Sequence, residues 1–265
     1  MSKKSDGPKI LFIDIETSPL ISYTWGIWDQ NIALNQIYKD WNIIAWAAKW
    51  QDSSEIMYMD QRKGINEKNE KKLLQEMWKL MDEADIIVGQ NSKKFDTKKL
   101  NSKFLLHKMQ PPSSYKQIDT LQLAKKHFSM TSNKLEFLSD KLNIKYKKLK
   151  HDKYPGFELW KEVMNGNQSA WKEMEKYNKF DVLATEELYT KIRAWDNSIN
   201  FNVYREEEDM VCTCGSKNFK LNGFSYTSVG KYRRYKCKDC SSELKSRFSE
   251  LTLEKRKSLK TGTVR

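Results

Sequence analysis

The chain has 265 residues, of which 38% are hydrophobic and 12% aromatic, a content that is typical of a folded protein and excludes a disordered one. No run approaches the roughly 18 apolar residues of a membrane span, and the polar start is not typical of a signal sequence. We therefore expect a cytoplasmic protein with no membrane partner. The net charge is +13, and from Met210 onward 14 Lys and Arg stand against 4 Asp and Glu. Nucleic acid is the expected partner of this basic part, and a surface that only aids solubility is the alternative.

Alternating apolar runs and amphipathic stretches follow along the chain. Runs rich in β-branched and aromatic residues predict strands of one sheet over residues 9–18, 23–28, 41–50, 55–59, 84–89 and 115–118. Apolar residues at helical spacing predict helices over residues 66–81, 96–107, 120–128, 133–142 and 168–195. The polar stretch 145–156 is expected to be an exposed loop. The pattern predicts an α/β domain with a mixed sheet over residues 8–197.

The first predicted strand delivers two carboxylates at its end, Asp14 and Glu16. Residues two apart on a strand point to the same side, so both side chains project together. Two ionised acids this close repel, and a hard divalent cation is the simplest way to stabilise them. The alternative is a pair of acids in a surface turn.

Two later segments carry further acids. Asp96 follows the strand predicted at 84–89 and opens the next helix, where a role as helix N-cap is the alternative. Tyr177 and Asp181 are four residues apart on the last predicted helix and therefore share a face. A solvated pair on that face is the alternative there.

The three segments together resemble a known family. Asp-x-Glu on the first strand, Asn-x3-Phe-Asp at 91–96 and Tyr-x3-Asp at 177–181 are similar to the three motifs of the DEDD superfamily of 3′-5′ exonucleases, in their order and separation. Lys176 stands where the histidine-bearing branch has its His, so the resemblance is to the tyrosine-bearing branch. Within it the chain looks most like bacteriophage-type exonucleases with a C-terminal zinc ribbon, over about residues 8 to 245. Gln90 replaces a His of that group, and we expect no effect on the chemistry.

The resemblance implies a fold and a site. The fold is an RNase H-like mixed five-stranded sheet flanked by helices, plus a small C-terminal zinc ribbon. Asp14, Glu16, Asp96 and Asp181 would hold two Mg²⁺ or Mn²⁺ ions, with Tyr177 beside the attacking water. Two such ions lower the pKa of the water and stabilise both the attacking and the departing oxygen of a phosphodiester. Carboxylate oxygens are the ligands that these hard ions prefer.

Several neighbours of the acids are expected to support the terminal nucleotide. Asn91 would do so by hydrogen bonding, Phe95 by stacking and Thr17 through its backbone. Asp119 follows a strand and lies near the site or caps a helix, and both interpretations stay open. The histidines fall outside the motifs and are expected to be surface or packing residues: His107, His127 and His151.

All four cysteines lie in the basic C-terminal part: Cys212, Cys214, Cys237 and Cys240. Two close pairs of thiols with no other cysteine favour a closed tetrahedral zinc site over free thiols. A segment this short has little core, so the metal would contribute folding free energy directly.

Bases alternate with aromatic residues between the two cysteine pairs. Lys231, Arg233, Arg234 and Tyr235 suit phosphate contact together with base stacking. A folded cap with a solvated basic face is the alternative. We expect a linker over residues 198–209, the zinc ribbon over 210–248 and a mobile basic tail over 249–265.

The sequence thus predicts a metal-dependent 3′-5′ exonuclease that releases nucleoside 5′-monophosphates from single-stranded or frayed ends, with DNA favoured over RNA. A structure-specific endonuclease on the same core is one rival, because a fold does not fix a function. A nucleic-acid-binding or inhibitory protein with a vestigial nuclease site is the other. The presence of all four acids and the tyrosine weighs against that second rival. Oligomeric state, pathway and protein partners leave no legible signal.

Overall fold

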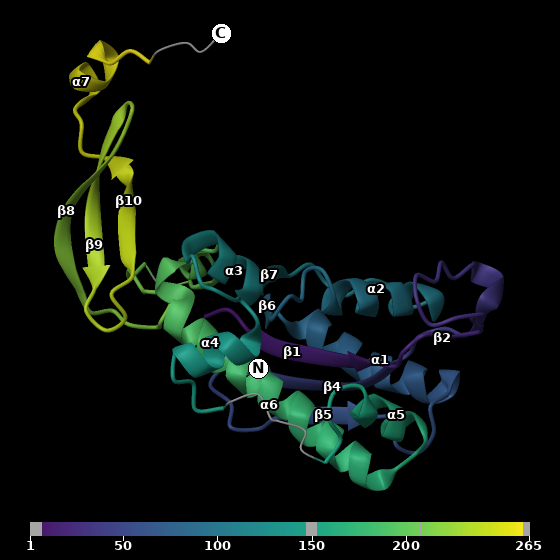
Figure 1. Cartoon of the computed structure of the whole chain (residues 1–265). Coiled ribbons are helices and arrows are strands. Elements are labelled where there is room, and N and C mark those ends of the chain that lie inside the picture. The colour runs from purple at the N-terminus through teal and green to yellow at the C-terminus, as the bar shows by residue number, and fades with distance from the viewer. Residues whose placement is uncertain (1–6, 147–152, 207, 262–265) are drawn as a thin grey trace. The chain divides into compact units, whose positions relative to one another are not determined.

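The computed structural model describes residues 7–146, 153–206 and 208–261, and every structural statement below refers to these residues (Figure 1). Contacts divide the chain into two compact units, one of residues 9–190 and one of residues 1–8 with 191–265. Each unit is described by itself. Part of the predicted loop at 145–156 and the end of the predicted tail lie outside the described residues.

The larger unit contains one sheet of five strands: β1 (Ile10–Thr17), β4 (Ile43–Trp50), β5 (Met57–Asp60), β6 (Ile86–Gly89) and β7 (Lys116–Asp119). Their order across the sheet is β5-β4-β1-β6-β7. Strand β1 runs antiparallel to β4 and parallel to β6, β5 is antiparallel to β4, and β7 is parallel to β6. The prediction of a mixed five-stranded sheet is confirmed.

Alternate residues of β1 serve different layers. Leu11, Ile13 and Ile15 pack into a core with buried side chains of α1 (Glu67–Glu83) and α2 (Asp96–Leu106). On the other side, the ring of Phe12 lies 6.2 Å from that of Tyr189 on α6 (Gln168–Ile192). Because side chains alternate along a strand, Asp14 and Glu16 share the α6 side with Phe12.

The remaining predicted helices are α3 (Thr120–His127) and α4 (Leu135–Lys141), and α5 (Glu158–Met164) precedes α6. Helices α5 and α6 bury apolar side chains together with Ile44 of β4. The side chain of Asn66 caps α1 by accepting a hydrogen bond from the backbone of Asn69. In the described part of the chain, every helix is too short or too polar to span a bilayer.

The strand predicted at 23–28 is wrong. Here the chain forms β2 (Ile21–Ser22) and β3 (Ile37–Lys39), a separate two-stranded sheet, with a 3-10 turn at Leu34–Gln36 before β3. Residues 23–28 themselves form bends and irregular backbone, and their aromatic side chains are exposed. The composition of a strand does not show whether a layer of protein covers it, so the expectation failed at this point.

The smaller unit contains a three-stranded antiparallel sheet of β8 (Phe219–Thr227), β9 (Gly230–Cys237) and β10 (Glu243–Ser249), with β9 in the middle. Two 3-10 turns, Arg193–Trp195 and Phe201–Tyr204, precede it. The expected basic tail contains a short helix, α7 (Leu253–Ser258). The side chain of Thr252 accepts a hydrogen bond from the backbone of Lys255 there, which caps this short helix.

Candidate active site and cysteine cluster

Four carboxylates reach one region of the larger unit from three elements. Asp14 and Glu16 come from β1, Asp96 is the first residue of α2, and Asp181 lies in the middle of α6. Glu16, Asp96 and Asp181 are buried. The backbone N–H of Ile15 donates to Oδ1 of Asp96 at 3.0 Å, so α2 begins against the strand that carries the first two acids.

The acids perturb one another. Burial raises the pKa of Asp14 well above its usual range, and the negative charges of Asp96, Asp181 and Glu16 raise it further. A hydrogen bond from Asn178 lowers this pKa by a smaller amount. Burial also raises the pKa of Asp96 to about 7, against the opposing hydrogen bonds from backbone N–H groups. The free site therefore holds more negative charge than it can stabilise.

Helix α6 adds two side chains on the same side. The sequence analysis missed Asn178, whose Nδ2 donates to the backbone oxygen of Asp14 at 3.2 Å and to its Oδ2 at 2.5 Å. Its place in the sequence between Tyr177 and Asp181 was the one feature that could have predicted a role for Asn178 at the site. The Tyr177 ring packs edge-on against Trp160, with ring centroids 6.0 Å apart. Burial, then the charges of Asp181 and Glu16, raise the pKa of the Tyr177 phenol, which stays protonated.

The loop between β6 and α2 is held by Asp119. This buried carboxylate accepts hydrogen bonds from the backbone of Asn91 at 3.0 Å and of Lys93 at 3.2 Å. It also accepts from the backbone of Leu121 and Gln122, and so caps α3. Both interpretations of Asp119 therefore apply, because one carboxylate caps a helix and fixes the loop before Asp96.

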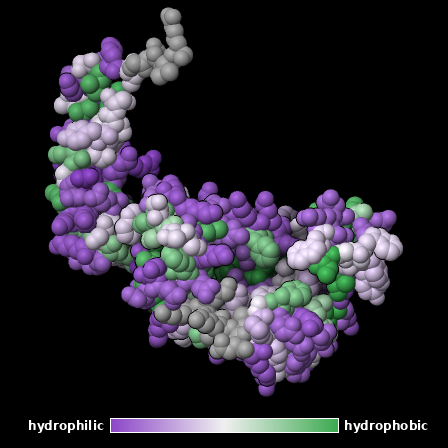
Figure 2. Space-filling view, in the orientation of Figure 1, coloured by the Kyte–Doolittle hydropathy of each residue, from purple (hydrophilic) through white to green (hydrophobic). Residues whose placement is uncertain are grey.

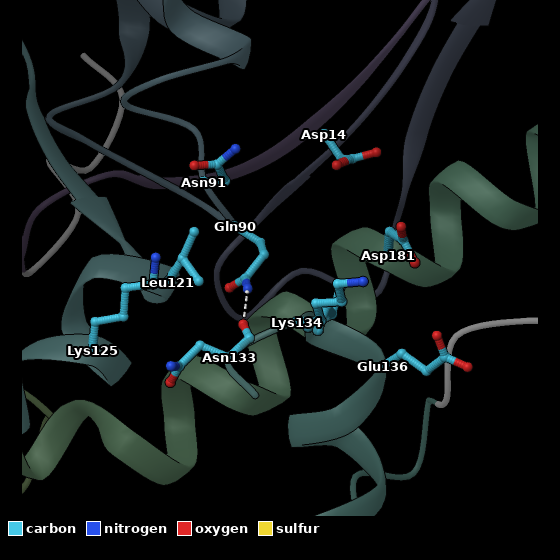
Figure 3. Close-up of a pocket in the computed structure, with 10 residues that line it drawn as sticks. Asp14, Gln90, Asn91, Leu121, Lys125, Asn133, Lys134, Glu136 and Asp181 are labelled. Carbon is cyan, nitrogen blue, oxygen red and sulfur yellow. Dashed lines mark hydrogen bonds between the residues drawn. The ribbon is translucent and has the colours of Figure 1, made fainter. Parts of the chain in front are cut away.

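A cavity of about 450 Å³ opens beside the acids, and Asp14, Asp181 and Asn91 line it (Figure 3). Two cations that the sequence analysis did not single out, Lys125 and Lys134, also line it. A ligand in this cavity would therefore meet both carboxylates and ammonium groups.

Gln90 lines the same cavity, and its amide is held at both ends. Its Nε2 donates to the backbone oxygen of Asn133 at 3.0 Å, and its Oε1 accepts from the Thr120 hydroxyl at 2.5 Å. Gln90 therefore ties the loop after β6 to α3 and to the segment before α4.

The other expected substrate residues surround the acids. Thr17 ends β1 at a register shift relative to β4, and Asn91 has a left-handed backbone with φ of 62°. Phe95 is partly exposed immediately before Asp96. Of the histidines, His107 is a packing residue whose Nε2 lies 3.0 Å from buried Glu70, and His151 lies outside the described residues.

The residues present fit divalent cations. The donor set is all oxygen, which hard cations prefer. Burial and, to a smaller extent, the neighbouring acids raise the pKa of Asp14, and a bound cation would oppose that increase. Among the described residues, the cysteines alone place three or more ligand atoms all within 4.8 Å of one another.

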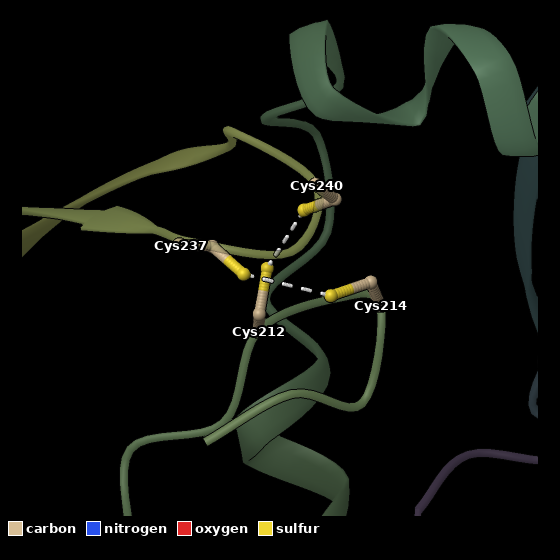
Figure 4. A group of neighbouring side chains, drawn as sticks. All are labelled: Cys212, Cys214, Cys237 and Cys240. Carbon is tan, nitrogen blue, oxygen red and sulfur yellow. Dashed lines mark hydrogen bonds between the residues drawn. The ribbon is translucent and has the colours of Figure 1, made fainter. Parts of the chain in front are cut away.

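The four cysteine sulfurs of the smaller unit face one another (Figure 4). Sγ of Cys212 lies 3.4 Å from that of Cys240, and Sγ of Cys214 lies 3.7 Å from that of Cys237. All four thiols are free and lie within 4.8 Å of one another. Four sulfurs at about 2.3 Å from a tetrahedral zinc would be about 3.8 Å apart, so the cluster fits this ion.

The thiols differ in acidity. Burial raises the pKa of Cys237, but backbone N–H groups of Cys240 and Asp239 donate to its sulfur and bring the pKa down to about 7. Burial raises the pKa of Cys214 and of Cys240. A bound cation would overcome that increase, because thiolate is the form that ligates zinc.

The expected nucleic-acid residues of β9 do not share one face. Lys231, Arg233 and Tyr235 alternate with Arg234, which therefore points to the opposite side. Arg233 pairs with Glu250 at 3.0 Å, and Nε of Arg234 donates to the backbone oxygen of Asn222 at 2.9 Å. Nζ of Lys231 lies 4.0 Å from the centre of the Phe224 ring.

Comparison with known proteins places the larger unit. A family model described as the RNase H superfamily matches residues 11–193. Among solved structures, the chain is similar to a family B DNA polymerase from the hyperthermophilic archaeon Pyrobaculum calidifontis, with a TM-score of 0.52 and 13% sequence identity. The match covers 71% of this chain and 25% of the polymerase, so the chain spans about a quarter of that protein. None of the curated proteins matches the chain.

Proposed function

The chain belongs to the RNase H superfamily, and from this premise we propose that it is a two-metal-ion 3′-5′ exonuclease. The observation that carries the proposal is the meeting of Asp14, Glu16, Asp96 and Asp181 beside an open cavity, with Tyr177 on the same helix as the last acid. Nuclease chemistry is the general expectation for this superfamily. The 3′-5′ direction and the release of 5′-monophosphates rest on the motif resemblance.

The four acids would hold two Mg²⁺ or Mn²⁺ ions, which, when bound, activate water and stabilise the charge that develops on the cleaved phosphate. The role of the chain is to position these acids before any ion arrives. Asn178 holds one oxygen of Asp14, and the backbone of Ile15 holds one oxygen of Asp96. Each of these acids keeps another oxygen as a potential ligand.

Tyr177 would orient the attacking water by hydrogen bonding. Its pKa is raised, so it is a poor general base at neutral pH. Packing against Trp160 fixes the ring. The phenol therefore contributes position rather than proton abstraction.

The cavity residues would bind the 3′-terminal part of a single or frayed strand. Asn91 would form a hydrogen bond with the terminal nucleotide, and Phe95 would stack on its base. The backbone of Thr17 would make a further contact with the same nucleotide. Lys125 and Lys134 add positive charge for the phosphates. DNA is favoured over RNA as the substrate.

The C-terminal part would be a zinc ribbon that holds nucleic acid. Cys212, Cys214, Cys237 and Cys240 would bind one structural Zn²⁺, and the basic and aromatic side chains of β9 would contact phosphates and bases. This binding would lengthen the time that the enzyme stays on its substrate, and the ribbon would not form a second active site.

The test uses 5′-labelled single-stranded DNA and RNA of one sequence, incubated with Mg²⁺, Mn²⁺ or chelator. We expect metal-dependent ladders that vanish with Asp14→Ala. Glu76→Ala is the control, because Glu76 is an exposed acid that pairs only with the exposed Lys79 in the described structure; it is expected to leave the ladders unchanged. A single internal cut would support the endonuclease instead. Retardation of both strands on a gel without shortening would support the binding protein.

A further inference from the structure

An arm of the larger unit, residues 20–38, exposes an unusual amount of apolar surface. Nine large hydrophobic side chains in this stretch are exposed, among them Trp25 at 99% and Trp28 at 82%. Figure 2 shows green and white residues among purple ones at the end of the larger unit that carries β2 in Figure 1. Tyr23 and Tyr38 are both exposed and pack edge to face at 5.6 Å. Exposed apolar side chains gathered in one stretch point to an interaction site.

The arm directly follows β1, the strand that carries two acids of the candidate active site. It leaves the sheet where β1 ends, a few residues after Asp14 and Glu16, and returns at the start of β4. Its base is closed by two hydrogen bonds of 2.8 Å, from the backbone of Ser18 to the oxygen of Asn42 and from the backbone of Asn42 to the Ser18 hydroxyl. A ligand leaving the acids along this edge would meet the arm.

Helix α2 supplies positive charge between the acids and the arm. Nζ of Lys99 lies 5.8 Å from the centre of the Phe95 ring and 3.5 Å from that of Trp41, which stands at the base of the arm. Lys103 also lies over Trp41. Lys98 is exposed on the first turn of α2, and Lys94 is exposed in the loop before it. Sites for single-stranded nucleic acid combine such a basic track with aromatic side chains on which bases stack.

We propose that the arm is a stacking platform for the bases of single-stranded nucleic acid whose 3′ end lies at the acids. This inference rests on the proposed function for the direction of the strand. Trp25, Trp28, Tyr23 and Tyr38 would each offer a ring to an unstacked base. The phosphates would follow the lysines of α2, because the arm itself carries one acid, Asp29, and no Lys or Arg.

The test measures binding rather than cleavage, so it is independent of whether the site is active. Asp14→Ala protein, with its ribbon zinc left in place and no added Mg²⁺ or Mn²⁺, is titrated with 5′-labelled DNA single strands of about 4 and about 16 nucleotides, followed by fluorescence anisotropy. Stacking is worth about 1–3 kcal/mol per base, or roughly 5- to 150-fold per aromatic side chain. Adding Trp25→Ala and Trp28→Ala is expected to weaken binding of the long strand at least tenfold and of the short strand far less.

Phe157→Ala provides the control, because Phe157 is an exposed aromatic residue outside the arm, and its binding should match the parent for both lengths. The two tryptophans are almost fully solvent-exposed, so loss of folding is not expected, and circular dichroism checks this. Equal losses for both lengths, or none, would overturn the proposal. Concentration-dependent self-association that the tryptophan variants abolish, without a change in DNA binding, would assign the arm to a second copy of the chain instead.

Failure of the proposed function would look different. If the wild-type protein cleaved nothing while the tryptophan variants still lost affinity for the long strand, the platform would stand and the exonuclease would not. If ladders formed normally and the variants bound both strands like the parent, the exonuclease would stand and the platform would not.

Discussion

The acids of the larger unit and the cysteines of the smaller one are both clusters of four ligands, but different forces assemble them. The acids come from positions as distant in sequence as Asp14 and Asp181, and a buried sheet with its helices brings them together. The cysteines come from two adjacent turns next to a sheet that has almost no fully buried apolar side chains. We therefore expect the larger unit to form its site before any ion binds, whereas the cysteine-bearing part would need its ion in order to fold.

The surroundings of the ligands differ in the same sense. Asp96 and Asp14 are held by hydrogen bonds from the backbone of Ile15 and from the side chain of Asn178. The cysteines are held by local turns, such as the bond of 2.8 Å from the backbone of Gly215, at φ of 86°, to the oxygen of Cys212. A core can oppose electrostatic repulsion with packing, and a turn has little packing with which to do so.

The largest effect is expected from removing zinc from the ribbon. Cys237→Ser, or a strong zinc chelator, is expected to unfold residues 210–248, because structural zinc supplies about 10 kcal/mol or more of folding free energy. Residues 9–190 should stay folded. Limited proteolysis read by mass spectrometry checks both statements, with Asp239→Asn, an exposed residue between two of the cysteines, as the control. A ribbon that resists protease without zinc would contradict the prediction.

Changing pH without metal should reveal the strain in the acid site. The pKa of Asp96 is raised from 3.8 to about 7, so the folded state binds this proton more tightly than the unfolded state does. Its contribution to stability is therefore present at low pH and is lost as pH rises from about 4 to 7, a change of at most about 4 kcal/mol.

Urea unfolding at pH 5 and pH 8 without added Mg²⁺ or Mn²⁺, followed by a signal from residues 9–190, measures this loss. Asp96→Asn keeps the acceptor for Ile15 but has no proton to lose, so its stability should depend less on pH. Mg²⁺ should restore stability to the wild-type protein at pH 8. Greater stability of the wild-type protein at pH 8 than at pH 5 without these ions would contradict the account.

Removing one hydroxyl tests whether the acids suffice. Tyr177→Phe keeps the packing against Trp160 and is expected to lower kcat by about 10- to 100-fold with little change in KM, since the phenol only orients water. Rates on a labelled oligonucleotide measure the effect. Tyr115→Phe serves as the control, because Tyr115 is a half-buried tyrosine packed against the core of β1, α1 and α2. A mutant with full activity would remove Tyr177 from the mechanism.

The smallest effect is expected where the site is held indirectly. Asp119→Asn replaces one of two accepting oxygens, so it should loosen the turn at Asn91 and Lys93, cost about 1 kcal/mol of stability and raise the Mg²⁺ concentration for half-maximal activity several-fold. Asp82→Asn, which alters an exposed carboxylate bonded to the backbone of Ser113, is the control. A loss of stability with an unchanged Mg²⁺ requirement would reduce Asp119 to a helix cap.

Local patterns predicted much of this fold. The apolar run of β1 and the helical spacing of α1 and α6 were legible because a core imposes those periods on the sequence. The five-stranded mixed sheet was expected from the resemblance to the DEDD exonucleases, because the residues alone do not show which strands pair. The bond of Asn178 to Asp14 joins residues 164 positions apart, and no local pattern encodes such a contact.

The exposed arm marks the other limit. The aromatic run after β1 reads like a buried strand, and only the absence of covering side chains around Trp25 and Trp28 in the described structure shows otherwise. The amide of Gln90 was likewise dismissed, although it links three segments at the cavity wall. Propensity describes a residue's own backbone, whereas both of these features depend on what lies next to the residue.

One hydrogen bond anchors an acid of the site through the backbone alone. The ladder between β1 and β6 pairs residues only as far as Phe12 and Val88, so the strands part before Ile15. The backbone N–H of Ile15 then donates to the carboxylate of Asp96, in the place where a neighbouring strand would have supplied the acceptor. Since every residue type except proline offers that N–H, this anchor of the acid depends on the parting of two strands and on no side chain of β1.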